Sequence, residues 1–388
     1  MQSAMNHDEP DRVPAMCQLA LGHYFLHCDF KPSEIWFDTE TFARALVSLQ
    51  ERYRFDGILV NLPGRPPDWR HRIESYEATE AGERLRWKSG LQTTVPRDDN
   101  AQTFCADAGR LPRADYTSID LADPGVQRIP GYVWNTWHAP ELWDIEPDAD
   151  LGDAAAYPAW FTAALEAVQQ QAPQVSVHPE VFSPFTHLME LFGYEQALMA
   201  LMDAPKTCHR VLATFTRTAL AQVALYGRHK PDAILVSSAF AGAGFISREM
   251  YREFVAPYEN EVFVAIRAAG VKSYVHTCGA IGDRLDLMAE TSVDGIDTLD
   301  PPPLGTVELD EAKAAYGSRF FFKGNLDAVN EMLDADDATF DEAVRNRIRI
   351  GKPGGGYILS SACSVAPHVK PARLTRLAEL AEALGRYS

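Results

Sequence analysis

The sequence contains no long apolar run and no excess of basic charge. No stretch of its 388 residues approaches the 18 or more apolar residues that a membrane-spanning helix needs. The N-terminal segment MQSAMNHDEPDR is polar and lacks the apolar core of a secretory signal, so we expect a cytoplasmic protein. Lys and Arg total 36 against 54 Asp and Glu, which gives a formal net charge of −18. Such a charge repels polyanions and argues against nucleic acid or an anionic membrane as a partner.

Cysteine is sparse and shows no disulfide pattern. The six cysteines are scattered along the chain, which suits reduced thiols better than a disulfide framework. Cys17 lies inside a predicted strand and Cys208 on the apolar stripe of a predicted helix, so we expect both to be core residues. The sequence offers no argument for Cys28 or Cys105. The remaining two cysteines each close a predicted strand.

Short apolar or β-branched segments alternate with helical patterns along the chain. Eight of these segments are predicted strands, and they cover residues 14–20, 57–63, 174–181, 233–240, 272–278, 295–300, 320–326 and 356–363. Alternating strands and helices imply a parallel sheet, and eight such units predict an α/β fold of the closed (β/α)8 TIM-barrel type. We therefore expect catalytic groups at the carboxyl ends of the strands.

One long excursion interrupts this alternation. Residues 64–173 contain a proline-rich start, a polar hairpin-like run and a tryptophan-rich segment, and all seven tryptophans precede residue 161. We interpret the excursion as a lid or substrate wall over the barrel mouth, with a satellite hydrophobic cluster as the alternative. The length would allow two average domains. The eight strands favour one barrel domain over residues 1–388 that carries this insertion.

The strongest chemical signal is His276-Thr277-Cys278 at the end of the fifth predicted strand. Side chains at positions i and i+2 of a strand share a face, with Cα atoms roughly 6.6 Å apart, so both can reach one ion. Cys363 closes the eighth predicted strand, and barrel closure brings it to the same rim. One histidine and two thiolates with an open fourth position are typical of catalytic zinc. An isolated H-x-C match is more often a buried thiol beside a histidine, but the second strand-end cysteine favours the metal.

Five further polar residues are candidates for the barrel mouth. Glu180, near the end of the third predicted strand, could be a fourth metal ligand or a proton carrier, although a simple rim carboxylate is the alternative. Asn61 interrupts an otherwise apolar strand. Asn325 and Asp327 follow another strand, where Asx capping of the loop is the alternative to a catalytic role. His23 is a candidate substrate contact, and a rim histidine without a role is its alternative.

The carboxyl-terminal half resembles the uroporphyrinogen decarboxylase superfamily, and specifically its zinc-dependent methyltransferase branch. The matching segments are SPFTHLMELFGYEQALMALMDAP (183–205), GFISREMYREFVAPY (244–258), VHTCGAIGDRLDLMAE (275–290), ELDEAKAAYG (308–317), FFFKGNLDAV (320–329) and GGYILSSACSVAP (355–367). That family has a (β/α)8 barrel. Its methyltransferase branch binds zinc through an H-x-C pair and a distant cysteine, and the resemblance assigns these roles to His276, Cys278 and Cys363.

The N-terminal part separates the two branches. The decarboxylases carry R-Q-A-G-R-Y after the first strand, and its arginines bind substrate carboxylates; the comparable stretch here, LALGHY (19–24), has neither arginine. A polycarboxylate buried without cationic partners is energetically costly. Arg65, Arg70 or Arg72 could substitute. The resemblance therefore favours the methyltransferase, and a decarboxylase-like lyase, or a zinc hydrolase, is the alternative.

A corrinoid (cobalamin) is the methyl carrier that the resemblance implies. Zinc would then bind a thiol acceptor as thiolate, or act as a Lewis acid on a small methylated donor. No D-x-H-x-x-G corrinoid-binding run occurs in the sequence, so we expect the corrinoid on a separate protein or free in solution. A purely structural zinc is a third possibility, but such sites usually have four protein ligands and the sequence offers three.

Overall fold

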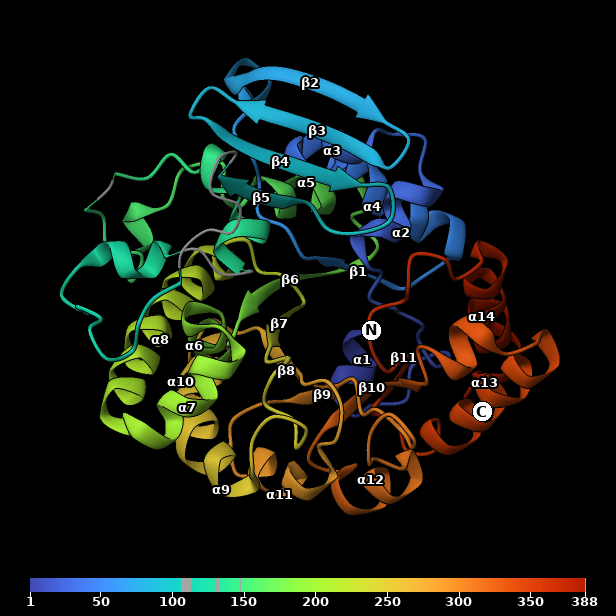
Figure 1. Ribbon diagram of the computed structural model, residues 1–388. Helices are drawn as coiled ribbons and strands as arrows, with labels where there is room; N and C mark the ends of the chain where they lie inside the picture. The colour runs from blue at the N-terminus through green and yellow to red at the C-terminus, as the bar shows by residue number, and fades with distance from the viewer. Residues whose placement is uncertain (106–112, 130–132, 147, 388) are drawn as a thin grey trace.

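A parallel sheet of seven strands forms the centre of the computed structural model, which describes residues 1–105, 113–129, 133–146 and 148–387. In hydrogen-bonded order the strands are β1 (Gly57–Val60), β6 (Ser176–Phe182), β7 (Ala233–Ser237), β8 (Lys272–His276), β9 (Gly295–Asp297), β10 (Phe321–Leu326) and β11 (Tyr357–Ser361). Figure 1 shows the sheet curled around the centre of the molecule with helices outside it. Seven predicted strands are thus confirmed.

The segment predicted as the first strand, residues 14–20, is not a regular strand. Ala15 and Leu19 form isolated parallel bridges with β11 and with Val365. The carbonyl of Ala15 also accepts a hydrogen bond from the backbone N–H of Asp56, just before β1. The ladder is interrupted because the N–H of Ala15 donates to the Asp56 carboxylate instead. The segment therefore lies between the two edge strands, and an eight-stranded closed barrel stays a prediction.

The interior of the curled sheet has an apolar layer and a polar layer. The apolar layer is a separate buried cluster that includes Met16, Leu59, Leu235, Tyr274, Phe321 and Ile358. Side chains two positions apart in an extended segment share a face. The residues two positions further toward the carboxyl ends are all polar, and they are Gln18, Asn61, Ser237, His276, Lys323 and Ser360. A polar layer therefore lies above the apolar layer at the carboxyl ends of the strands, where barrel enzymes carry their chemistry.

Helices with amphipathic faces surround the curled sheet, except that the short N-terminal helix places Ala4 and Met5 in the apolar cluster inside the sheet. They are α1 (Gln2–Met5), α2 (Leu21–His27), α3 (Pro32–Phe37), α4 (Thr39–Tyr53), α5 (Ala163–Gln171), α6 (Pro184–Phe192), α7 (Tyr194–Asp203), α8 (Pro205–Gly227), α9 (Arg248–Met250), α10 (Ala256–Ala268), α11 (Leu285–Ala289), α12 (Leu309–Tyr316), α13 (Asp337–Gly351) and α14 (Pro371–Leu384). Cys208 is fully buried on the inner face of α8, and Cys17 is also buried. No helix in the described part of the chain is long and apolar enough to span a bilayer.

The excursion begins with a small antiparallel sheet. Its strands β2 (Ile73–Thr79), β3 (Gly82–Trp87), β4 (Leu91–Pro96) and β5 (Gln102–Cys105) pair in chain order. The sheet lies at the top of Figure 1 and packs against α3, where the rings of Phe37 and Trp87 meet edge to face at 5.3 Å. A later part of the excursion reaches the strand ends, because Trp137 packs edge-on against Phe182 of β6 at 5.6 Å. Coverage of the barrel mouth by the whole excursion stays a prediction.

Candidate metal centre

The three side chains predicted as metal ligands converge on one point. Nε2 of His276, the last residue of β8, lies 3.3 Å from Sγ of Cys278 and 3.9 Å from Sγ of Cys363. The two sulfur atoms are 3.8 Å apart. A tetrahedral zinc ion with Zn–S bonds of about 2.3 Å and a Zn–N bond of about 2.0 Å separates two sulfurs by about 3.8 Å, and sulfur from nitrogen by about 3.5 Å. The donor set therefore fits one zinc ion.

A buried carboxylate supports the histidine from behind. Nδ1 of His276 lies 3.1 Å from Oδ2 of Asp297 and 2.9 Å from Oγ1 of Thr298. The other oxygen of Asp297 accepts a hydrogen bond from Nζ of Lys323 at 2.9 Å. Strand register explains the alignment, since His276 pairs with Asp297 across β8 and β9, and Asp297 with Lys323 across β9 and β10. A carboxylate in this position orients a ligand histidine and leaves its other nitrogen free for a metal.

The charges of the centre suit a cation. A hydrogen bond from Cys278 lowers the pKa of Cys363 well below its ordinary value, which favours the thiolate form of Cys363. Burial alone would raise the pKa of Asp297, but Lys323 and His276 outweigh it and lower that pKa. Burial likewise disfavours the charged form of His276, yet Cys278 and Asp297 outweigh it and raise its pKa well above the ordinary value. The carboxylate of Asp297 therefore faces the imidazole from one side and the two cysteine sulfurs face it from the other.

Asn61 and Glu180 lie next to each other at neighbouring strand ends. The register pairs Val60 of β1 with Pro179 of β6, so the following residues stand at the same level. Their exposed fractions are 6% and 8%. Burial raises the pKa of Glu180 to about 7, although hydrogen bonding to Ser237 and the charge of His276 act against it. Glu180 is not part of the group whose ligand atoms all lie within 4.8 Å of one another. Glu180 is therefore not placed as a fourth metal ligand in this structure. The role of Glu180 as a proton carrier stays a prediction.

Asn325 and Asp327 are engaged in holding loops. Nδ2 of Asn325 donates to the carbonyls of Leu299 and Val307 at 2.9 and 3.3 Å, and its Oδ1 accepts from Nε of Arg347 at 3.0 Å. Oδ1 of Asp327 accepts from the backbone N–H groups two and three residues ahead, both at 2.8 Å. These contacts correspond to the loop-capping alternative. Catalytic roles for the two residues stay predictions.

His23 has both ring nitrogens occupied. Its Nε2 lies 2.8 Å from the hydroxyl of Tyr53, and its Nδ1 lies 3.1 Å from the carbonyl oxygen of Pro367. The side chain is fully buried, and burial lowers its pKa to about 4, so the ring is neutral. Substrate contact by His23 stays a prediction, because it would require one of these two bonds to open.

The three arginines that could bind substrate carboxylates have other partners. The guanidinium of Arg65 is buried and donates to the main-chain carbonyls of Trp36, Trp137 and His138. Arg70 and Arg72 each form ion pairs with two carboxylates of the chain. Each of these cations thus already has carboxylate or carbonyl partners within the protein.

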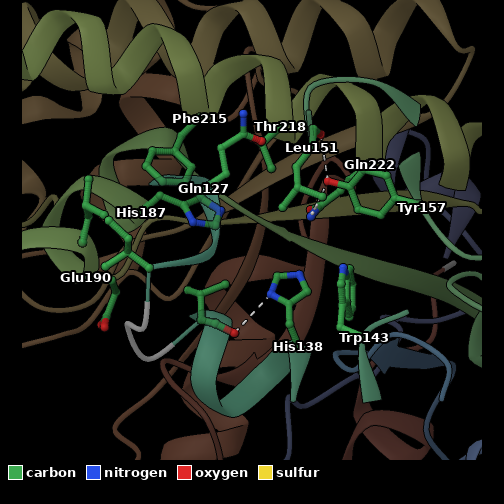
Figure 2. A pocket seen from close by; sticks show the side chains of 13 residues that line it. Gln127, His138, Trp143, Leu151, Tyr157, His187, Glu190, Phe215, Thr218 and Gln222 are labelled. Carbon is green, nitrogen blue, oxygen red and sulfur yellow. Dashed lines mark hydrogen bonds between the residues drawn. The ribbon is translucent and has the colours of Figure 1, made fainter. Parts of the chain in front are cut away.

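A small cavity marks the place where the excursion meets α6 and α8. Its volume is about 20 Å³, room for about one water molecule, and its lining includes His138, His187 and Gln222. Figure 2 shows the rings of both histidines facing this space, with Gln222 hydrogen-bonded to Tyr157 beside them. Burial lowers the pKa of both histidines to about 3. The cavity is too small for a substrate, and it belongs to the packing of the excursion.

Comparison with known proteins shows one family and one fold. The sequence model of the family "Uroporphyrinogen decarboxylase (URO-D)" matches residues 139–384. A uroporphyrinogen decarboxylase of Rhodococcus opacus (strain B4) is 28% identical over 258 residues, covering 61% of this chain and 69% of its own. One of Saccharopolyspora erythraea is 30% identical over 197 residues, covering 49% and 53%.

Two solved structures share the fold at low sequence identity. A methyltransferase from Methanosarcina mazei has a TM-score of 0.69 at 13% identity, and the match covers 98% of this chain and 97% of that one. A B12-independent methionine synthase from Shewanella sp. W3-18-1 has a TM-score of 0.51 at 10% identity, with 96% and 97% covered. At these identities the likeness concerns the fold alone.

Proposed function

Because the chain belongs to the uroporphyrinogen decarboxylase family, we propose that it is a zinc-dependent methyltransferase. The methyl group would move between a small methylated donor or a thiol acceptor and a corrinoid carrier. The observation that carries the proposal is the convergence of His276, Cys278 and Cys363, whose separations match the edges of a tetrahedral zinc site. The corrinoid would come from a separate protein, since the sequence lacks a D-x-H-x-x-G run.

The side chains around the centre have distinct tasks in this proposal. Zinc, when bound, would deprotonate a substrate thiol or polarise the heteroatom that carries the methyl group. Cys278 and Cys363 offset the charge of the ion, and Asp297 keeps Nε2 of His276 directed at the thiols. Glu180, with its pKa raised by burial to about 7, can hold or release a proton near neutral pH.

The alternative is a decarboxylase-like lyase on the same scaffold, in line with the names of the curated relatives. Removing a carboxylate from a polycarboxylate substrate requires cations that hold the remaining ones. Arg65, Arg70 and Arg72 are all occupied, as is Lys323 by Asp297. These contacts favour methyl transfer over decarboxylation.

The proposal includes a complete barrel. Residues 14–20 would serve as the eighth strand, because they bridge to β11 and accept a hydrogen bond from the residue before β1. Residues 64–173 would serve as an insertion that forms part of the mouth, supported by the contact of Trp137 with Phe182. The chain would then be one barrel domain over residues 1–388.

Methyl transfer to and from cobalamin tests the proposal directly. The zinc-loaded protein would be incubated with cob(I)alamin and a panel of methyl ethers, methylamines and betaines, and separately with methylcobalamin and thiols. The absorbance change between the two cobalamin forms reports turnover. We expect Cys278→Ser to be inactive and Cys208→Ser, a buried cysteine on α8, to remain active at matched folding. Decarboxylation of uroporphyrinogen without any methyl transfer would support the alternative instead.

A further inference from the structure

Several buried oxygen atoms at the strand ends have no hydrogen-bond partner. They are Oε1 of Gln18, Oδ1 of Asn61, Oε2 of Glu180 and Oγ of Ser360, judged over the residues that the structure describes. Buried polar atoms are almost always hydrogen-bonded in folded proteins, and exceptions concentrate where a ligand or water completes the site. Four such atoms at neighbouring strand ends therefore indicate a binding surface that the protein alone leaves unsatisfied.

These atoms share the polar layer inside the curled sheet. Gln18, Asn61 and Ser360 each stand two positions beyond a residue of the buried apolar cluster. Glu180 stands two positions beyond His178, whose Nδ1 lies 3.0 Å from the hydroxyl of Tyr274 in that same cluster. All four therefore face the interior above the apolar layer.

The four residues come from neighbouring segments, on a different part of the sheet from His276 and Cys278. Ser360 belongs to β11, Gln18 to the segment beside it, Asn61 follows β1, and Glu180 belongs to β6. The pair His276 and Cys278 comes from β8, farther along the sheet. We call these four residues the acceptor arc. The arc and the metal centre thus stand at the carboxyl ends of different strands of one sheet.

The chemistry of the arc selects hydrogen-bond donors. The amide oxygens of Gln18 and Asn61 only accept hydrogen bonds, and so does ionised Glu180. The neighbouring cation in this layer, Lys323, is already paired with Asp297 at 2.9 Å. An anionic ligand group, which only accepts hydrogen bonds, would leave these oxygen atoms unsatisfied. An ammonium or hydroxyl group would satisfy them.

We infer that the ligand of this site is a small neutral or cationic molecule whose ammonium or hydroxyl group is held by Gln18, Asn61 and Glu180. Its reacting atom lies at the centre formed by His276 and the two cysteines, so the inference rests on the proposed metal function. Substrates recognised through several carboxylates fall outside this class.

Three short thiols test the inference with a constant metal-binding atom. 2-Aminoethanethiol, 2-mercaptoethanol and 3-mercaptopropionate present an ammonium, a hydroxyl and a carboxylate at their far ends. Each would be titrated into the cobalt(II)-substituted protein at pH 7, with the sulfur-to-cobalt absorption band as the signal. We expect the ammonium thiol to bind about tenfold or more tightly than the carboxylate thiol, the range of one charge-assisted hydrogen bond.

The three thiols also differ in their own acidity. Measuring the same thiols with variants of the arc cancels this difference, because it is the same for every variant. The double variant Gln18→Met/Asn61→Leu should reduce the preference for the ammonium thiol over the carboxylate thiol about tenfold. Glu180→Gln keeps the size and one oxygen and should lose the preference for ammonium over hydroxyl. Gln92→Met, on β4 of the small sheet, is the matched control and should keep the wild-type preference.

The possible failures are distinguishable. Failure of the wild-type protein to bind cobalt would overturn the metal centre and this inference together. Normal cobalt binding with equal affinity for the three thiols, or an unchanged preference in both arc variants, would overturn the inference alone. Circular dichroism establishes that each variant is folded, and Glu180→Gln provides the readout if the double variant does not fold.

Discussion

Replacing Asp297 by Asn tests whether this carboxylate supports His276 as a metal ligand, apart from its contribution to the stability of the fold. The carboxylate contacts His276 on one side and Lys323 on the other, and its side chain and that of Lys323 are 2% and 3% exposed. Loss of a carboxylate behind a ligand histidine weakens metal binding by about 10- to 100-fold. The same change leaves a buried ammonium unpaired, which lowers the free energy of unfolding by about 3–5 kcal/mol.

A second substitution distinguishes the two effects. In Asp297→Asn/Lys323→Met the unpaired ammonium is gone, so the free energy of unfolding should recover while zinc affinity stays low. Zinc affinity would be measured by competition with a chromophoric chelator at pH 7, and stability by urea unfolding of the zinc-free protein. Asp341→Asn removes a partly exposed partner of Arg376 and serves as the control, with at most about 1 kcal/mol lost. A double variant that binds zinc as tightly as the wild type would refute the role given to Asp297.

Three further outcomes are expected. Burial lowers the pKa of His138 and His187 to about 3, so between pH 6.5 and 3 the unfolded chain binds more protons than the folded one. The free energy of unfolding should therefore fall as pH falls through this window, by up to about 1.4 kcal/mol per pH unit and histidine, as urea titrations at several pH values would show. Cys208→Ser should lower the free energy of unfolding by about 1–3 kcal/mol without changing the zinc content. Cys278→Ser should lose most of the zinc, as measured by elemental analysis. Arg65→Met removes the guanidinium donor from the carbonyls of Trp36, Trp137 and His138 and should speed proteolysis of the excursion; unchanged cleavage would argue against that anchoring role.

The parallel sheet was predictable because its strands are buried on both faces and appear as short apolar runs between helical patterns. Residues 14–20 have the same composition, yet they do not form a regular strand. The carboxylate of Asp56 takes the N–H of Ala15 in place of a backbone carbonyl, and no local pattern shows that contact. The four-stranded sheet of the excursion was visible only as one hairpin-like run.

The convergence of the three candidate metal ligands could be predicted because His276 and Cys278 are two positions apart at the end of one strand and Cys363 follows the end of another. Asp297 and Lys323 were missed because their position depends on register across β8, β9 and β10. A charged residue inside a short apolar strand was the available signal. Asn325 and Asp327 are a different case, since these strand-end polar residues hydrogen-bond loop backbone and Arg347 while their predicted catalytic roles stay predictions.

The central claim is a catalytic zinc held by one nitrogen and two sulfurs of the protein, and X-ray absorption at the zinc edge tests it most directly. Elemental analysis of the purified protein should give about one zinc per chain. The spectrum should show two sulfurs at about 2.3 Å, one histidine nitrogen at about 2.0 Å and one further light atom, and an added thiol should replace the light atom with a third sulfur. A protein without zinc, or a zinc whose coordination contains no sulfur from Cys278 and Cys363, would contradict the account.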